Sequence, residues 1–184
     1  VYLAANYGIS KLNIRADEFA FTTFSGIPVD QVVVHRNRIF AGTAEGIYAI
    51  ETDAFNPENF GAWQWLGPEQ GFPADYSCAA LCVFNDELYA EINGELFRIG
   101  ADGPVFFRRE DGHRLDYLSA EGPNLLTYFR CTGSGCGPGI LRLFRPDGST
   151  DRYSTSCLGD PKYAIEDEQG RVWFADGFRG FRSL

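Results

Sequence analysis

The sequence has no methionine, only two histidines, and no apolar run near the roughly 20 residues that a membrane-spanning helix needs. Its first residues, VYLAANYGIS, have neither the basic start nor the apolar centre of a signal peptide. We therefore expect no transmembrane segment in this chain, and we expect any targeting segment to have been removed or to lie outside it. The missing initiator methionine indicates a processed or excised chain.

Basic residues are scarce as well. The sequence has 16 Lys and Arg residues and 25 Asp and Glu residues, which gives a formal net charge of −9. Such a chain repels phosphate backbones, so nucleic acid is not an expected partner. With 45% hydrophobic and 15% aromatic residues, the chain can nevertheless bury a substantial core.

Helical periodicity is absent over any useful length, and a two-strand pattern takes its place. It recurs five times, as VYLAANYGISKL (1–12), IFAGTAEGIYAI (39–50), LYAEINGELFRI (88–99), LLTYFR with GILRLF (125–144) and VWFADGFRGFRSL (172–184). Each copy has an aliphatic start, a turn that ends on glycine, and a second apolar stretch. Because glycine adopts the positive φ that tight hairpins need, each copy predicts a β-hairpin.

Two further strand-like runs lie between successive hairpins, which makes four strands per repeat. The repeats start at residues 1, 39, 88, 125 and 172, and this period of about 43 is typical of four-stranded propeller blades. We therefore predict an all-β fold, a β-propeller of four-stranded antiparallel blades. The expected blades are 1–26 (partial), 27–67, 76–110, 114–156 and 161–184 (partial), all within one propeller domain.

Three full and two partial blades predict an incomplete ring and a piece of a longer chain. Recurring aromatic residues at Tyr2, Phe40, Tyr89 and Trp173 are expected to fill the space between blades. Trp63 and Trp65 are expected to do the same from one face of an outer strand.

Groups for catalysis or metal binding are sparse. His35 and His113 have no partner at metal-ligand spacing. Asp111, His113 and Ser119 could be drawn as a hydrolytic triad, but the serine lacks the G-x-S-x-G context of a nucleophile elbow. We expect no enzyme activity, no catalytic residue, no metal site and no cofactor.

The five cysteines leave at least one thiol unpaired. Cys131 and Cys136 bracket a glycine-rich loop, where a short disulfide could close the turn. Cys78 and Cys82 are placed four apart on one predicted strand, about 13 Å from each other, so they cannot bridge and are expected to be small core residues.

Residues that interrupt the repeat lie in the connections, where binding residues are often found. The 51–62 insertion carries Phe55 and Phe60, which either fold back onto the blade or present apolar anchors to a partner. Arg108 and Arg109 form a basic cluster that could receive a carboxylate or phosphate group, although a solvated face explains them as well. These four residues are the candidate partner-binding positions.

Two family resemblances follow from the repeat motifs. AIEDEQGRVWFADGFRG, at 164–180, resembles the regulator-propeller repeat in sensor portions of hybrid two-component histidine kinases. VYLAANYGISKLNI, FAFTTFSG and RIFAGTAEGIYAIETDAFNPENFGAWQWL resemble the propeller region of the PorZ family, surface components of the type IX secretion system. The second resemblance is strongest over 1–66 and weakens over 115–160. It carries over no functional residue.

The PorZ resemblance implies a non-enzymatic scaffold or recognition propeller in the periplasm or at the cell surface, associated with the outer membrane. Its expected partner is a protein or a glycan such as lipopolysaccharide. Two alternatives stay open: a periplasmic ligand-sensing propeller of a hybrid histidine kinase, and a carbohydrate-active propeller enzyme. A membrane span and a kinase in the same reading frame would favour the sensor, whereas convergent carboxylates would favour the enzyme.

Overall fold

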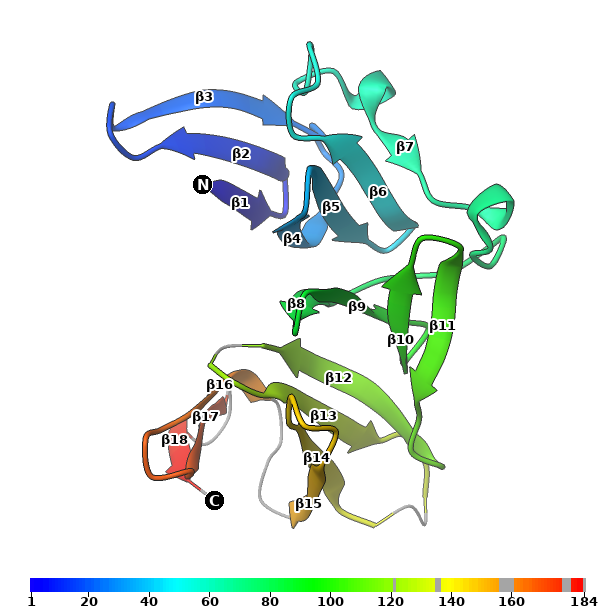
Figure 1. Cartoon of the computed structure of the whole chain (residues 1–184), viewed down its shortest axis with the longest axis vertical. Coiled ribbons are helices and arrows are strands. Elements are labelled where there is room, and N and C mark those ends of the chain that lie inside the picture. Colours follow the sequence, from blue (N-terminus) through cyan, green and yellow to red (C-terminus); the bar gives the residue numbers. More distant parts are fainter. Residues whose placement is uncertain (121, 135–136, 156–160, 177–179, 184) are drawn as a thin grey trace. The chain divides into compact units, whose positions relative to one another are not determined.

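The computed structural model describes residues 1–120, 122–134, 137–155, 161–176 and 180–183 (Figure 1). Over these ranges the chain forms β-strands and two short 3-10 turns, η1 (Phe60–Ala62) and η2 (Pro68–Gln70). No helix in this part of the chain is long and apolar enough to cross a membrane.

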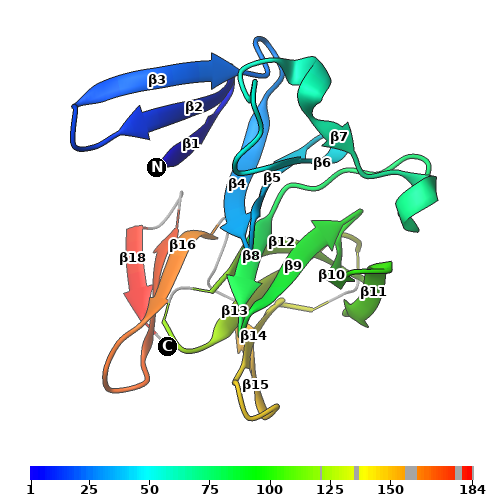
Figure 2. The ribbon, with the colours of Figure 1, turned by 45° about the horizontal axis from the view of Figure 1, so that its top comes forward.

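The strands form five antiparallel sheets, and in each sheet hydrogen-bonded neighbours are also neighbours in sequence (Figures 1 and 2). The first sheet consists of β1 (Tyr2–Ala5), β2 (Gly8–Asn13) and β3 (Glu18–Thr23). The second consists of β4 (Val29–His35), β5 (Arg38–Thr43), β6 (Gly46–Glu51) and β7 (Gln64–Trp65). The third consists of β8 (Leu81–Phe84), β9 (Glu87–Ile92), β10 (Glu95–Gly100) and β11 (Gly103–Arg108). The fourth sheet consists of β12 (His113–Ser119), β13 (Leu125–Cys131), β14 (Gly139–Phe144) and β15 (Thr150–Thr155). The fifth consists of β16 (Pro161–Glu166), β17 (Val172–Asp176) and β18 (Gly180–Ser183).

This arrangement confirms the predicted fold class: along the sequence, a three-stranded sheet is followed by three four-stranded sheets and then by another three-stranded sheet. The blade limits predicted above, and their membership of one domain, stay predictions.

Turn chemistry accounts for most of the hairpins. Gly46 and Gly94 have φ values of +105° and +88°, which side chains with a Cβ rarely adopt. Gly139 differs, because a Cβ there would lie 2.3 Å from the hydroxyl oxygen of Tyr128, and its φ is not in the positive region. The expectation of a positive φ is therefore wrong for Gly139, where glycine permits close packing instead.

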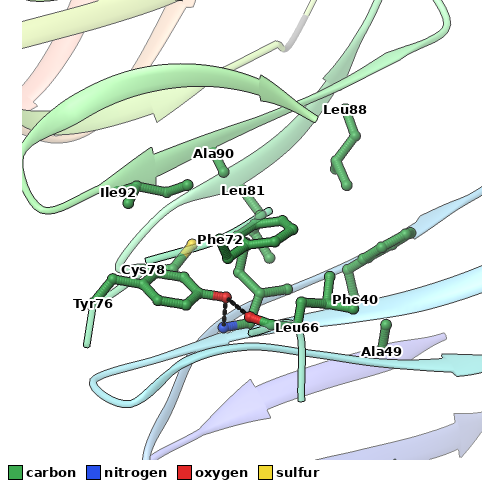
Figure 3. Packing of buried hydrophobic residues seen from close by; sticks show 11 residues of the cluster. Phe40, Ala49, Leu66, Phe72, Tyr76, Cys78, Leu81, Leu88, Ala90 and Ile92 are labelled. Atoms are coloured by element: carbon green, nitrogen blue, oxygen red, sulfur yellow. Dashed lines mark hydrogen bonds between the residues drawn. The ribbon is translucent and has the colours of Figure 1, made fainter. Parts of the chain in front are cut away.

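The chain divides into two compact units, residues 1–93 with 97–106, and residues 94–96 with 107–184. The first unit holds two apolar clusters. One joins the first and second sheets and includes Ile9, Phe24, Val29, Ile39, Ala41, Ile50 and Trp63. The other joins the second and third sheets and includes Phe40, Ile47, Ala49, Leu66, Phe72, Tyr76, Cys78, Leu81, Leu88, Ala90 and Ile92 (Figure 3). Full burial of each large apolar side chain contributes about 1.5–3 kcal/mol.

The long connection between β7 and β8 supplies part of this second cluster. Phe72 and Tyr76 come from the connection and not from a strand. The Tyr76 hydroxyl accepts a hydrogen bond from the Ile47 N–H at 3.0 Å and donates one to the Leu66 carbonyl at 2.7 Å (Figure 3). The connection is thus fixed to β6 by backbone groups as well as by apolar contact.

Two strand predictions need correction here. The strand expected from Ser77 begins only at Leu81, so Cys78 lies before it. Trp63 precedes β7 and is buried, whereas Trp65 lies in β7 with 36% of its surface exposed. The two indoles therefore do not share one strand face.

The second unit has its own core between the fourth and fifth sheets, formed by Leu126, Tyr128, Leu141, Leu143, Ala164, Val172 and Phe174. The Tyr117 hydroxyl on β12 accepts a hydrogen bond from the Ala164 N–H on β16 at 2.8 Å. A hydrogen bond between a side chain and the backbone therefore joins these two sheets in addition to their apolar contacts.

Candidate binding surfaces

The 52–62 loop is held firmly against the second sheet. Trp63 donates its indole N–H to the Pro57 carbonyl at 3.0 Å, and the Asn59 side chain accepts a hydrogen bond from the Gly61 N–H at 3.0 Å. The Trp63 ring meets Phe24 edge-on, with centroids 4.9 Å apart. At the start of the loop, the Thr52 N–H donates to the Asn37 carbonyl at 2.9 Å. Both ends and the middle of the loop are thereby fixed.

The two phenylalanines of this loop have different surroundings. Phe60 packs edge-on against Phe24, with centroids 4.7 Å apart, and lies 5.3 Å from the Tyr48 ring. Phe55 is fully exposed, at 104% of its reference surface. One aromatic side chain therefore anchors the loop, and the other is presented to solvent.

Arg108 is the last residue of β11 and Arg109 follows it, and both form ion pairs within the second unit. Arg108 donates its Nε–H to Glu110 at 2.9 Å, and Glu110 also accepts from Arg142. Burial alone would raise the pKa of Glu110, but the hydrogen bonds and charges of Arg142 and Arg108 outweigh it and lower the pKa. Arg109 lies 3.7 Å from both Glu95 and Asp111 and stays largely exposed. A role of Arg108 and Arg109 in partner binding stays a prediction.

The cysteines fall into two groups. Cys78 and Cys82 are free and buried, as expected of small core residues, and burial raises the pKa of Cys82 to about 12. Cys131 is disulfide-bonded. Its predicted partner, Cys136, lies outside the described residues, so the Cys131–Cys136 pairing stays a prediction.

His113 holds two loops of the second unit together. Its Nδ1 lies 2.9 Å from the carbonyl oxygen of Asp111, and its Nε2 lies 3.0 Å from that of Pro138. Both ring nitrogens therefore face backbone acceptors. Within the described ranges, no three His, Cys, Asp or Glu side chains are grouped to hold a metal ion.

The acidic turn of the 164–180 motif has a local structural role. Asp167 accepts hydrogen bonds from the indole N–H of Trp173 at 2.7 Å and from the Nε–H of Arg171 at 2.8 Å. The Trp173 hydrogen bond is the largest cause that lowers the pKa of Asp167, and with the bonds from Arg171 and Gln169 it brings this pKa to about 2. The expected filling role between sheets holds for Phe40, which lies in the cluster of the second and third sheets, and for Tyr2, which packs against the cluster of the first and second. It does not hold for Trp173, which is 36% exposed. Tyr89 is buried and contacts Phe84 of its own sheet, so its role between sheets stays a prediction.

A groove in the first unit was not predicted from the sequence. It has a volume of about 340 Å³ and is lined by residues of the second and third sheets and of the connection between them, namely His35, Arg36, Arg38, Phe40, Leu66, Gln70, Phe72, Asp86, Glu87, Leu88, Ile99, Gly100, Ala101 and Gly103. The volume is near the lower end of the range for small-molecule sites. A sequence signal did exist, since the β4–β5 turn is basic and the equivalent β8–β9 turn is acidic.

No family model matches the sequence, and no curated protein gives a significant match. Several solved structures, however, match it significantly. PorZ, an essential surface component of the type IX secretion system of Porphyromonas gingivalis, is 17% identical with a TM-score of 0.68, over 100% of this chain and 23% of PorZ. The extracellular domain of the putative hybrid two-component system BT4673 of B. thetaiotaomicron is 14% identical with a TM-score of 0.67, over 95% of this chain and 23% of that one.

Hydrazine synthase of Kuenenia stuttgartiensis is 11% identical with a TM-score of 0.67, over 100% of this chain and 60% of that chain. This chain thus spans about a quarter of the length of PorZ and of the BT4673 domain. Identities this low concern the fold alone. Together with the five sheets, they establish that the chain has a β-propeller-type fold.

Proposed function

We propose that this chain is a non-enzymatic recognition propeller of the periplasm or cell surface, associated with the outer membrane. It binds a protein or a glycan such as lipopolysaccharide through the 52–62 loop. The observation that carries the proposal is a fully exposed phenylalanine, Phe55, on a loop whose ends and middle are fixed. A pre-ordered loop loses little conformational freedom on binding, and a buried aromatic anchor is a common hot spot.

The resemblance to PorZ supports this assignment, because PorZ is itself a bacterial surface component. The non-enzymatic role is supported by the surroundings of His113, whose ring nitrogens face the carbonyls of two loops. A histidine held in this way stabilises loops and is poorly placed to exchange protons with a substrate.

A ligand-sensing propeller is the second candidate. Its support is the Asp167 turn, which lies in the motif similar to regulator-propeller repeats, together with the likeness to the BT4673 extracellular domain. In that case the groove of the first unit would be the sensing site.

The test compares Phe55→Ser with Phe60→Ser in the purified protein. Binding is measured by co-sedimentation with the outer-membrane fraction of the organism that encodes the protein. Since Phe55 makes no buried contact, F55S should leave the melting temperature unchanged and weaken binding at least about tenfold, as expected of a hot spot. Ile14→Ser, which removes another exposed apolar side chain (68%), is the matched control and should bind normally.

Phe60→Ser should lower the melting temperature, because it removes two aromatic contacts from the core side of the loop. Unchanged binding by F55S would overturn the proposed role of the loop. Lost stability in F60S together with intact binding in both variants would make the loop purely structural.

A further inference from the structure

The groove of the first unit separates charge between its two sides. The β4–β5 turn contributes three basic side chains, His35, Arg36 and Arg38. The β8–β9 turn contributes two carboxylates, Asp86 and Glu87. A ligand in the groove therefore meets cationic groups from the second sheet and anionic groups from the third.

The floor between these sides is apolar. Phe40 and Leu66 come from the second sheet and its following connection, Phe72 from the connection, and Leu88 from the third sheet (Figure 3). Ile99 extends this floor from β10 and stays partly exposed. An apolar group of a ligand can rest on this floor without displacing polar side chains.

The charges differ in how firmly they are engaged. Glu87 accepts a hydrogen bond from Arg98 at 2.9 Å, and Arg38 donates one to Gln64 at 3.2 Å. Arg36 and Asp86 form only a loose pair with each other, at 3.7 Å, and their side chains are 71% and 81% exposed. Exposed pairs of this kind contribute little to stability, so a ligand can replace them at small cost.

We propose that the groove binds a zwitterionic amino acid with an apolar side chain. Arg36 would receive the α-carboxylate, Asp86 the α-ammonium group, and the floor the side chain. A guanidinium and a carboxylate suit these two charges, and the volume suits one small molecule. The site is independent of Phe55, so its success or failure is separable from that of the surface recognition proposed above.

The ligand test uses isothermal titration with four compounds up to about 10 mM, a range that detects weak sites. L-Phenylalanine carries both charges. 3-Phenylpropanoate lacks the ammonium group, 2-phenylethylamine lacks the carboxylate, and N-acetyl-L-phenylalanine amide lacks both. L-Phenylalanine should bind most tightly and the neutral amide most weakly. No binding of L-phenylalanine, or equal binding of the neutral amide or of either singly charged compound, would overturn the proposal.

Two variants test the charge assignment. Arg36 and Asp86 have φ values of +52° and +57°, a conformation that asparagine tolerates well, so Arg36→Asn and Asp86→Asn should keep both turns. R36N should weaken L-phenylalanine and 3-phenylpropanoate about two- to fivefold and leave 2-phenylethylamine unchanged. D86N should weaken L-phenylalanine and 2-phenylethylamine and leave 3-phenylpropanoate unchanged.

The matched controls are Arg15→Asn and Asp17→Asn, exposed charges in the β2–β3 turn. Asp17 also has a positive φ, +52°, so D17N repeats the backbone setting of D86N outside the groove. Both controls should bind like the unmodified protein. An equal loss in the controls, or the same loss for all ligands in R36N and D86N, would overturn the assignment.

Discussion

Replacement of Tyr76 by phenylalanine removes one oxygen atom that serves two backbone groups of the first unit. Tyr76 is 2% exposed, and its hydroxyl joins the Ile47 N–H to the Leu66 carbonyl. Each of these backbone groups would be left buried without this partner. An unsatisfied buried group costs about 1–3 kcal/mol, and the better burial of a phenyl ring offsets part of the sum. We expect Y76F to lower the free energy of unfolding by about 2–3 kcal/mol.

Urea denaturation of the purified protein measures this loss, and amide hydrogen exchange at Ile47 locates it. Tyr7→Phe is the control, because Tyr7 is 59% exposed and its hydroxyl makes no hydrogen bond within the described part of the chain. Y7F should change the stability by less than about 0.5 kcal/mol. A loss of under about 0.5 kcal/mol in Y76F as well would refute the reasoning, because the two backbone groups would then have found other partners.

Alkaline pH gives a second readout of the same hydroxyl. Burial, the largest cause, raises the pKa of Tyr76 above its ordinary value. The neutral form therefore stabilises the fold fully below pH about 10, the unfolded value, and this stability is lost as the pH rises further. Y76F should lose less stability than the unmodified protein between pH 10 and 12. Identical alkaline profiles would contradict a buried, hydrogen-bonded hydroxyl.

The disulfide, the Glu110 ion pairs and the Phe24 ring contacts can each be tested separately. Thiol counting under denaturing conditions should find three free cysteines if Cys131 and Cys136 are paired, and peptide mapping should recover both in one disulfide-linked fragment; five free thiols would refute the pairing. Glu110→Gln should cost about 1–2 kcal/mol, because it leaves the buried Arg142 without a carboxylate. Since the pKa of Glu110 is lowered, its contribution is present above pH about 4.5 and lost as the pH falls below that value, so the unmodified protein and E110Q should converge in stability in acid. Phe24→Ala should cost about 3–5 kcal/mol in urea denaturation, because Phe24 lies at the centre of contacts with Tyr48, Phe60 and Trp63, and a loss under about 1 kcal/mol would contradict this role.

The sheets could be predicted from the sequence because their determinants are local. The alternation of apolar and polar residues and the turn residues both lie within a single hairpin. Asn93 and Gly94, for example, both have the positive φ that their turn requires. The four-strand repeat then follows from spacing alone. Gly139 shows the limit of this logic, because its function depends on contact with Tyr128 on the neighbouring strand.

The 66–80 connection could not be predicted in the same way, because its backbone partners are distant in sequence. The Cys78 N–H donates to the Thr43 carbonyl at 2.9 Å, and the Ala79 N–H donates to the Glu91 carboxylate at 2.7 Å. These bonds replace the strand pairing that an apolar run from Ser77 predicts. Glu91 is 1% exposed and occupies the position that Gly42 has in the preceding repeat. A carboxylate in place of glycine is the sequence feature that indicates a different pairing of the preceding segment.

The groove could not be predicted from the sequence for a related reason. Charged turn residues of a single hairpin are expected to be solvated, and Arg36 and Asp86 are each largely exposed. Only the packing of the second sheet on the third brings the Arg36 guanidinium to within 3.7 Å of the Asp86 carboxylate. The sequence holds the two charge types, but the fold decides that they share one groove.

Arg38 connects the two candidate surfaces of the first unit. It lines the groove over the Phe40 ring, at 5.4 Å from the centroid, and it donates a hydrogen bond to Gln64 just beyond the 52–62 loop. Its Nε lies 3.2 Å from Glu51 just before the loop, as an ion pair without hydrogen-bond geometry. A substitution of Arg38 would therefore alter both surfaces at once, whereas Phe55 and Arg36 test them separately. Arg38 lines the groove and contacts Glu51 and Gln64, the residues that flank the loop on either side. If amino-acid binding changes the affinity of the loop for its partner, R38Q should therefore abolish this coupling while leaving Phe55 exposed.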